Sequence, residues 1–197
     1  MPQDVLKTLP GYDPDVQKNR AEAREIMDRL GYGTDKRLAL KVSTRNIPPY
    51  RDPAVILTDQ LKEVFIDGKL EIVETASWFP KVMRKDYKIG LNLTGGGVDD
   101  PDQQFYENYA CGSPRNYTGY CNPELDKLFD QQSSASEEGK RKKLVWEIER
   151  KLAEDGARPI IFYNRFAYCW RPLVKGWTMI VNSIINNWRM EDVWLDR

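Results

Sequence analysis

The spacing of apolar residues predicts that helices and strands alternate along most of the chain. Asp13-Pro14-Asp15 is a typical helix start, because it combines a capping carboxylate with a proline at the first helical position. Apolar residues at helical spacing follow, and Gly31 is a typical helix end. Residues 38–44 alternate between apolar and other side chains, which is the period of a strand. The apolar stripe of the first helix consists of Ala23, Ile26, Met27 and Leu30.

A second helix and two further strands are expected before residue 94. The helix follows a proline-rich loop, and residues 69–74 then predict a second strand. Residues 87–93 predict a third strand, whose continuous apolar character favours a central position in a sheet. The apolar residues assigned to the second helix are Val55, Ile56, Leu61, Val64 and Phe65.

Three more helices and a fourth strand are expected after a glycine run. The helices are predicted at residues 103–109, 123–132 and 137–155, and the last carries apolar residues at helical spacing. Residues 159–163 predict a strand. Strands and helices in alternation with short connections predict an α/β lobe, with a mixed, partly parallel sheet flanked by helices.

The C-terminal segment, residues 165–197, has a different character. It carries four of the six tryptophans of the chain, Trp170, Trp177, Trp188 and Trp194, without a helical period. Because such residues are unfavourable in water, we expect this segment to lie against another surface. That surface belongs either to this lobe or to a partner.

Composition and charge exclude several function classes. Hydrophobic residues make up 41% and charged residues 30%, as in ordinary globular domains. Thirty basic residues balance thirty acidic ones, so no overall field attracts nucleic acid, and glutamates on the same helix neutralise the basic run at Lys140–Lys143. No apolar stretch is long enough for a membrane span, and the first residues lack the features of a secretion signal.

The chain contains no histidine, which lowers the expectation of catalysis. Histidine is the usual general base near neutral pH and the commonest metal ligand, and we predict no catalytic residues, no metal and no cofactor. One alternative is a hydrolase or lyase that uses a carboxylate pair, such as Asp99 or Asp100 with Glu107. Another is a stand-alone interaction module that dimerises through its C-terminal segment.

The chain has three cysteines. Cys111 and Cys121 bracket a turn-rich loop, and they form either a disulfide or two free thiols. Cys169 is interpreted as a small buried residue.

Several landmarks then occur in a characteristic order. Leu9–Pro14 precedes the helix that ends at Leu30-Gly31-Tyr32, and Asp99-Asp100-Pro101-Asp102 follows the third strand. In this order the chain resembles the peptide/nickel-type solute-binding proteins of bacterial ABC importers, called family 5. The later landmarks are Asn116, Tyr120, Asn122-Pro123-Glu124-Leu125-Asp126, Arg141, Trp146, Glu149, Leu152, Asp155 and Pro159-Ile160.

This resemblance implies that the chain is the C-terminal lobe of such a receptor, with a type II periplasmic-binding-protein fold. Residues 1–34 are then a lead-in helix, 35–164 the lobe, and 165–197 a segment returning to an N-terminal lobe that is not in this chain. The resemblance also implies capture of a small solute, a peptide or another, in a cleft between lobes and delivery to ABC permease subunits. A periplasmic location and a Cys111–Cys121 disulfide follow from it. A homodimer of the fragment through its tail is a further expected partner.

The candidate ligand-binding residues lie where strands end, because such sheets bind ligands beyond their carboxyl ends. After the third strand come Thr94, Gly95, Gly96, Gly97 and Asp99. Thr94 and Gly97 stand where relatives often carry a tryptophan and an aspartate, which argues against recognition of a peptide α-amino group. A tight turn without ligand contact is the alternative for the glycines, and helix capping for the acids.

Three more candidates follow the first two strands: Arg45, Tyr50 and Trp78. The dipeptide-binding branch carries Arg-Pro-Tyr where this chain has Pro48-Pro49-Tyr50, and Arg45 lies close enough in sequence to replace the missing arginine. For Tyr50 and Trp78 the alternative is simple packing, which for Trp78 is the stronger expectation.

Overall fold

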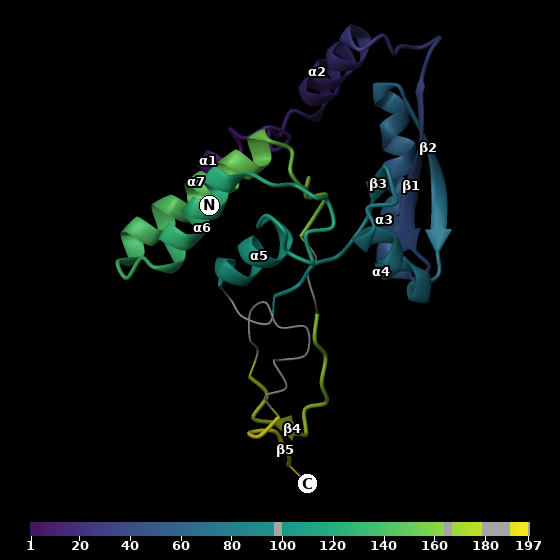
Figure 1. The fold of residues 1–197 in the computed structure, drawn as a ribbon. Helices are drawn as coiled ribbons and strands as arrows, with labels where there is room; N and C mark the ends of the chain where they lie inside the picture. Colours follow the sequence, from purple (N-terminus) through teal and green to yellow (C-terminus); the bar gives the residue numbers. More distant parts are fainter. Residues whose placement is uncertain (97–99, 164–166, 179–189, 197) are drawn as a thin grey trace.

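The computed structural model describes residues 1–96, 100–163, 167–178 and 190–196. Alternating helices and strands make up the first part, followed by three helices and a C-terminal segment with two short strands (Figure 1). The elements are α1 (Gln3–Leu6), α2 (Val16–Arg29), β1 (Leu38–Arg45), α3 (Pro48–Leu61), the 3-10 turn η1 (Lys62–Val64), β2 (Ile66–Val73), α4 (Thr75–Met83), β3 (Ile89–Gly90), α5 (Pro101–Asn108), α6 (Pro123–Ser133), α7 (Glu138–Glu154), β4 (Val174–Lys175) and β5 (Trp194–Leu195).

The main sheet is parallel and has the order β2-β1-β3. β1 and β2 pair along their whole length, from Leu38 opposite Ile66 to Arg45 opposite Val73. The α/β class with a parallel sheet and flanking helices is therefore confirmed. The predicted central position of residues 87–93 is wrong, because only Ile89 and Gly90 pair, on one side, with β1. Their apolar character instead fills the core beneath α3, where Leu91 is buried.

Helices cover both faces of this sheet. On one face, Val42 packs with Ala54 of α3 and with Leu91. α4 approaches the other face, since Lys81 of α4 pairs with Glu71 of β2. The second helix is confirmed as far as Leu61, but Val64 lies in η1 and Phe65 follows that turn with a positive φ. Val55 and Ile56 are in α3 but are exposed. The stripe of α2 differs in the same way, since Met27 is buried while Ile26 and Leu30 are exposed.

The helices α5, α6 and α7 form a second core, which lies apart from the sheet in Figure 1. The Phe105 and Phe129 rings stack with centroids 5.3 Å apart. All three helices begin within two residues of their predicted starts, because each has a capping side chain: Asp100, Asn122 and Glu137. In α2 the capping side chain is Asp15 rather than Asp13. The apolar residues buried in this core are Phe105, Leu125, Phe129, Ile148 and Leu152.

Two expectations for the last third of the chain are wrong. Residues 159–163 form no strand, because none of the strands in the described part of the chain hydrogen-bonds to them, and the side chains of Ile160, Ile161 and Phe162 are exposed. Cys169 is a free, exposed thiol rather than a buried one. Its neighbour Trp170 stacks on Trp177 at 6.0 Å between ring centroids but keeps about half of its surface exposed.

The predicted packing of the C-terminal segment on another surface stays a prediction. Trp194 is exposed, and Trp188 lies outside the described residues. Within the described ranges, no helix combines the length and apolar character that a membrane crossing needs.

Candidate functional site

The carboxyl ends of β1 and β2 bring several of the predicted residues to one edge of the sheet. The two strands are parallel and in register, so Arg45 and Val73 end them side by side. The next helices begin at once: α3 at Pro48 and α4 at Thr75. Side chains from both helices therefore reach the last residue of β1.

Arg45 contacts side chains from both helices that begin at this edge. Its Nη1 donates to Tyr50 Oη at 3.2 Å, and its guanidinium carbon lies 4.8 Å from the centre of the Tyr50 ring. The same carbon lies 5.2 Å from the centre of the Phe79 ring. Both distances are within the range of cation–π attraction. The predicted pair Arg45 and Tyr50 is thus in contact, and Phe79, which sequence reasoning did not single out, completes the cluster.

Phe79 escaped prediction because no helix was expected after the second strand. An aromatic residue five positions beyond a strand carries no signal by itself. The contact forms because α4 turns back over the sheet, so that Phe79 meets Arg45, which lies 34 positions earlier in the chain. Periodicity within one segment cannot reveal such a pairing.

A polar network fixes α4 on this face of the sheet. Glu71 of β2 accepts from Ser43 Oγ at 2.6 Å, and it pairs with Lys41 Nζ at 3.1 Å and Lys81 Nζ at 3.3 Å. The Ser43 hydrogen bond, with those of the two lysines, lowers the pKa of Glu71 to about 2. Since Lys81 belongs to α4, this network positions the helix that carries Phe79.

Trp78 is fully buried on α4, where Val82 one turn later is buried as well. Its indole Nε1 has no hydrogen-bond partner among the residues that the structure describes. Packing, the stronger expectation for this residue, agrees with its burial, and a ligand-binding role for it stays a prediction.

The glycine run follows β3 beyond the same edge. Thr94 and Gly95 are exposed and Gly96 is half-buried. Gly97 and Asp99 lie outside the described residues, so the predictions for them stay predictions.

The neighbouring acids have structural partners. Asp100 caps α5 by accepting from Asp102 N at 2.9 Å, and it accepts from both Nη1 and Nη2 of Arg141 at 2.7 Å. Hydrogen bonds from Arg141 lower the pKa of Asp100. Asp102 accepts from Ser133 Oγ at 2.7 Å. The capping interpretation of Asp100 is confirmed.

Glu107, the other acid of the hydrolase alternative, pairs with Arg115 Nη1 at 2.7 Å. A search of the described ranges finds no group of acidic residues, cysteines or histidines that could hold a metal ion. Asp100, Asp102 and Glu107 therefore each have a partner that helps to hold α5 and its loop in place.

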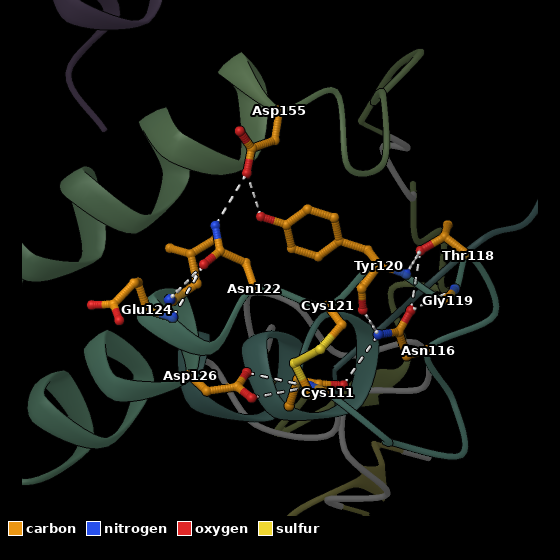
Figure 2. The surroundings of a disulfide bond; sticks show 12 residues. Cys111, Asn116, Thr118, Gly119, Tyr120, Cys121, Asn122, Glu124, Asp126 and Asp155 are labelled. Carbon is orange, nitrogen blue, oxygen red and sulfur yellow. Dashed lines mark hydrogen bonds between the residues drawn. A yellow bond between two sulfur atoms is a disulfide. The ribbon is translucent and has the colours of Figure 1, made fainter.

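The predicted disulfide joins Cys111 and Cys121 (Figure 2). Inside the closed loop, the buried Asn116 amide donates to Ala110 O at 3.1 Å and to Tyr120 O at 2.6 Å. Its Oδ1 accepts from Thr118 Oγ1 and from Gly119 N. The loop also touches the sheet unit, because Tyr87 Oη donates to Tyr117 O at 2.8 Å.

Comparison with known proteins shows that the chain is similar to part of several solute-binding proteins. No model of a known protein family matches the chain. The oligopeptide-binding protein AppA of Bacillus subtilis is 28% identical over 163 residues, which cover 76% of this chain and 30% of AppA. The probable D,D-dipeptide-binding periplasmic protein DdpA of Escherichia coli is 24% identical over 169 residues, 84% of this chain and 31% of DdpA.

The fold agrees with that of solved receptors. One of them is Haemophilus influenzae OppA, solved in complex with the peptide RPPGFSPFR. The match covers 99% of this chain and 38% of the OppA chain, with a TM-score of 0.76 and a sequence identity of 20%. The likeness to OppA shows the fold. The chain spans about 30% of the length of the curated relatives it matches. The resemblance drawn from the sequence is confirmed.

Proposed function

Because this chain is similar in sequence and fold to part of the solute-binding proteins of ABC importers, we propose that it forms one wall of a solute cleft in such a receptor. The observation that carries the proposal is the cluster at the carboxyl end of β1. There Arg45 lies between the rings of Tyr50 and Phe79, and the Phe79 ring is exposed at the edge. Ligands of α/β sheets bind at this end of the strands.

The remaining parts of the chain take roles around this wall. Residues 35–164 form the lobe, 1–34 lead into it, and 165–197 return toward a second lobe that contributes the opposite wall. The exposed apolar residues of the last segment, Trp170 and Trp194 among them, support such a covering partner. The proposed location is outside the cytoplasm, and the proposed recipient of the solute is an ABC permease.

Tyr50 orients Arg45, and Phe79 offers the solute an apolar face. Thr94, Gly95 and Gly96 extend the wall beyond β3, where small residues let a solute approach the backbone. Catalysis is not part of the proposal, since the relatives with similar sequences are named as binding proteins and the acids near this edge have structural partners.

Ligand-observed NMR with pooled short peptides tests the proposal. We expect saturation transfer from the 197-residue chain to pool members, with dissociation constants in the weak range because one wall desolvates only part of a ligand. Tyr50→Phe, which removes the hydroxyl that orients Arg45, should weaken binding. Tyr32→Phe, at a tyrosine that contacts Lys36 rather than the edge, is the matched control. Absence of transfer from a folded chain to every pool would refute the proposal.

A further inference from the structure

We infer that Phe79 selects among solutes by stacking against an aromatic side chain, while the Arg45 guanidinium holds the Phe79 ring from the other side. The inference rests on the proposed solute-binding function and deepens it, because it names the kind of side chain that the wall recognises. Phe79 is an apolar ring at the carboxyl edge of the sheet, and 40% of its surface is exposed.

The Phe79 side chain lies at the edge and is not buried beneath α4. Trp78 and Val82, on the inward face of the same helix, are buried, whereas Phe79 is exposed. The Arg45 guanidinium carbon lies 5.2 Å from the centre of the Phe79 ring, so the ring meets the last residue of β1. Ligands of such sheets bind at this end of the strands, and an exposed ring there can contact the solute.

The surroundings of Phe79 leave room for a second ring. The first turn of α4 consists of Thr75, Ala76 and Ser77, which are exposed and small, so their side chains leave the Phe79 ring accessible. Among the residues that the structure describes, the paired aromatic rings do not include Phe79. A ring supplied by the solute therefore has no competitor within the described part of the chain.

Arg45 makes the Phe79 ring a better partner for an aromatic group than for an aliphatic one. Tyr50 holds the guanidinium in place, because Arg45 Nη1 donates to Tyr50 Oη at 3.2 Å and the Tyr50 ring lies 4.8 Å away. A cation over one face of a ring draws the π electrons toward itself. The far face of the ring becomes less negative, which weakens the repulsion between π systems that opposes stacking. An aromatic ring stacked there gains an attraction that a saturated side chain of the same size lacks.

A pair of tripeptides separates ring stacking from plain apolar burial. The first is alanyl-phenylalanyl-alanine, and the second carries cyclohexylalanine in place of phenylalanine. The saturated ring is the more apolar of the two, so removal of apolar surface from water alone favours the cyclohexyl peptide. We expect the phenylalanyl peptide to bind about threefold to tenfold more tightly to the 197-residue chain in a titration followed by NMR.

The ring resonances of Phe79 report the contact directly. In the chain labelled with ¹³C in its phenylalanine rings, Phe79→Leu identifies these resonances by their loss. The ring current of the phenylalanyl peptide should shift them upfield, and the cyclohexyl peptide should leave them nearly in place. Phe79→Leu should also remove the preference between the peptides, because leucine keeps an apolar surface without a ring. Met83→Leu, at an exposed apolar residue one turn further along α4, is the matched control that should keep the preference.

The outcomes distinguish the two proposals. Circular dichroism confirms that both variants are folded, and the peptide comparison on the unmodified chain does not depend on them. Equal or tighter binding of the cyclohexyl peptide overturns the stacking inference and leaves the solute-binding function standing. A preference for the phenylalanyl peptide that survives Phe79→Leu also overturns it, and would fit a Phe79 that packs against a second lobe instead. Binding of neither peptide, and of no other peptide in the pools, removes the solute-binding function and the inference with it.

Discussion

Removing the Cys111–Cys121 disulfide should destabilise the chain by an amount set by its short loop. The two cysteines are 10 residues apart, and the chain-entropy relation for a loop of that length gives about 2.7 kcal/mol at 25 °C. The native loop should survive in a Cys111→Ala/Cys121→Ala variant, because Asn116 still makes its hydrogen bonds to Ala110 and Tyr120. The loss should therefore arise in the unfolded chain, which gains freedom when the bridge is absent.

Urea denaturation followed by circular dichroism measures this loss. The background for both proteins is Cys169→Ala, since Cys169 is exposed and an exposed thiol can cross-link two chains on oxidation. Thiol titration of the unmodified chain in denaturant should find one reactive group. Three reactive groups would show that the bridge is absent. A bridge that is present but whose removal costs less than about 1 kcal/mol would refute the entropic account.

Three further changes test other contacts. Asn116→Asp replaces a buried amide that donates to two carbonyl oxygens by a carboxylate that cannot donate, and should cost about 2–4 kcal/mol in urea denaturation. The milder comparison is Asn19→Asp, at a half-buried amide that donates to one carbonyl oxygen, that of Asp13. Arg141→Lys removes the bidentate hydrogen bonding to Asp100 and should lower the free energy of unfolding by about 1–2 kcal/mol in the same measurement. Lys142→Arg, on the exposed side of α7, should leave the free energy of unfolding unchanged. Glu71 has a folded-state pKa of about 2, below its ordinary value of 4.5, so its ionised form stabilises the fold fully above about pH 4.5 and progressively less as the pH falls toward 2. The stability difference between the unmodified chain and Glu71→Gln should follow that window, and a difference that does not vary between pH 7 and pH 2 would contradict this assignment.

Features encoded within one segment were predictable from the sequence. Asn122 and Glu137 cap helices whose predicted starts, at residues 123 and 137, lie within one residue of the observed starts, because a capping side chain acts on backbone only two or three residues away. The alternation of residues 38–44 likewise identified β1. Strand pairing was less predictable, since it needs a partner from elsewhere. Residues 159–163 have the composition of a strand, but no described strand pairs with them, so composition alone gave the wrong prediction.

The candidate site shows the same difference between features within one segment and contacts between distant segments. Arg45 and Tyr50 were both assigned to this strand end from the sequence, and the contact between them is seen only in the structure. Phe79 and the burial of Trp78 depend on α4 folding back onto the sheet, which the Glu71–Lys81 pair helps to fix. A contact between segments so far apart needs the fold itself.

Two kinds of unsatisfied group remain on this chain, and they make different demands on whatever covers them. The exposed apolar side chains of the C-terminal segment, such as Trp170 and Trp194, are stabilised by any dry surface of suitable shape, because the hydrophobic effect has no direction. Within the described residues the buried N–H groups of Arg45 and Trp78 have no acceptor, and a hydrogen bond, unlike an apolar contact, requires an acceptor at a defined place. Under the proposed function, we therefore expect removal of apolar surface from water to favour association with a second lobe, and directional polar contacts at the strand edge to contribute to discrimination between solutes.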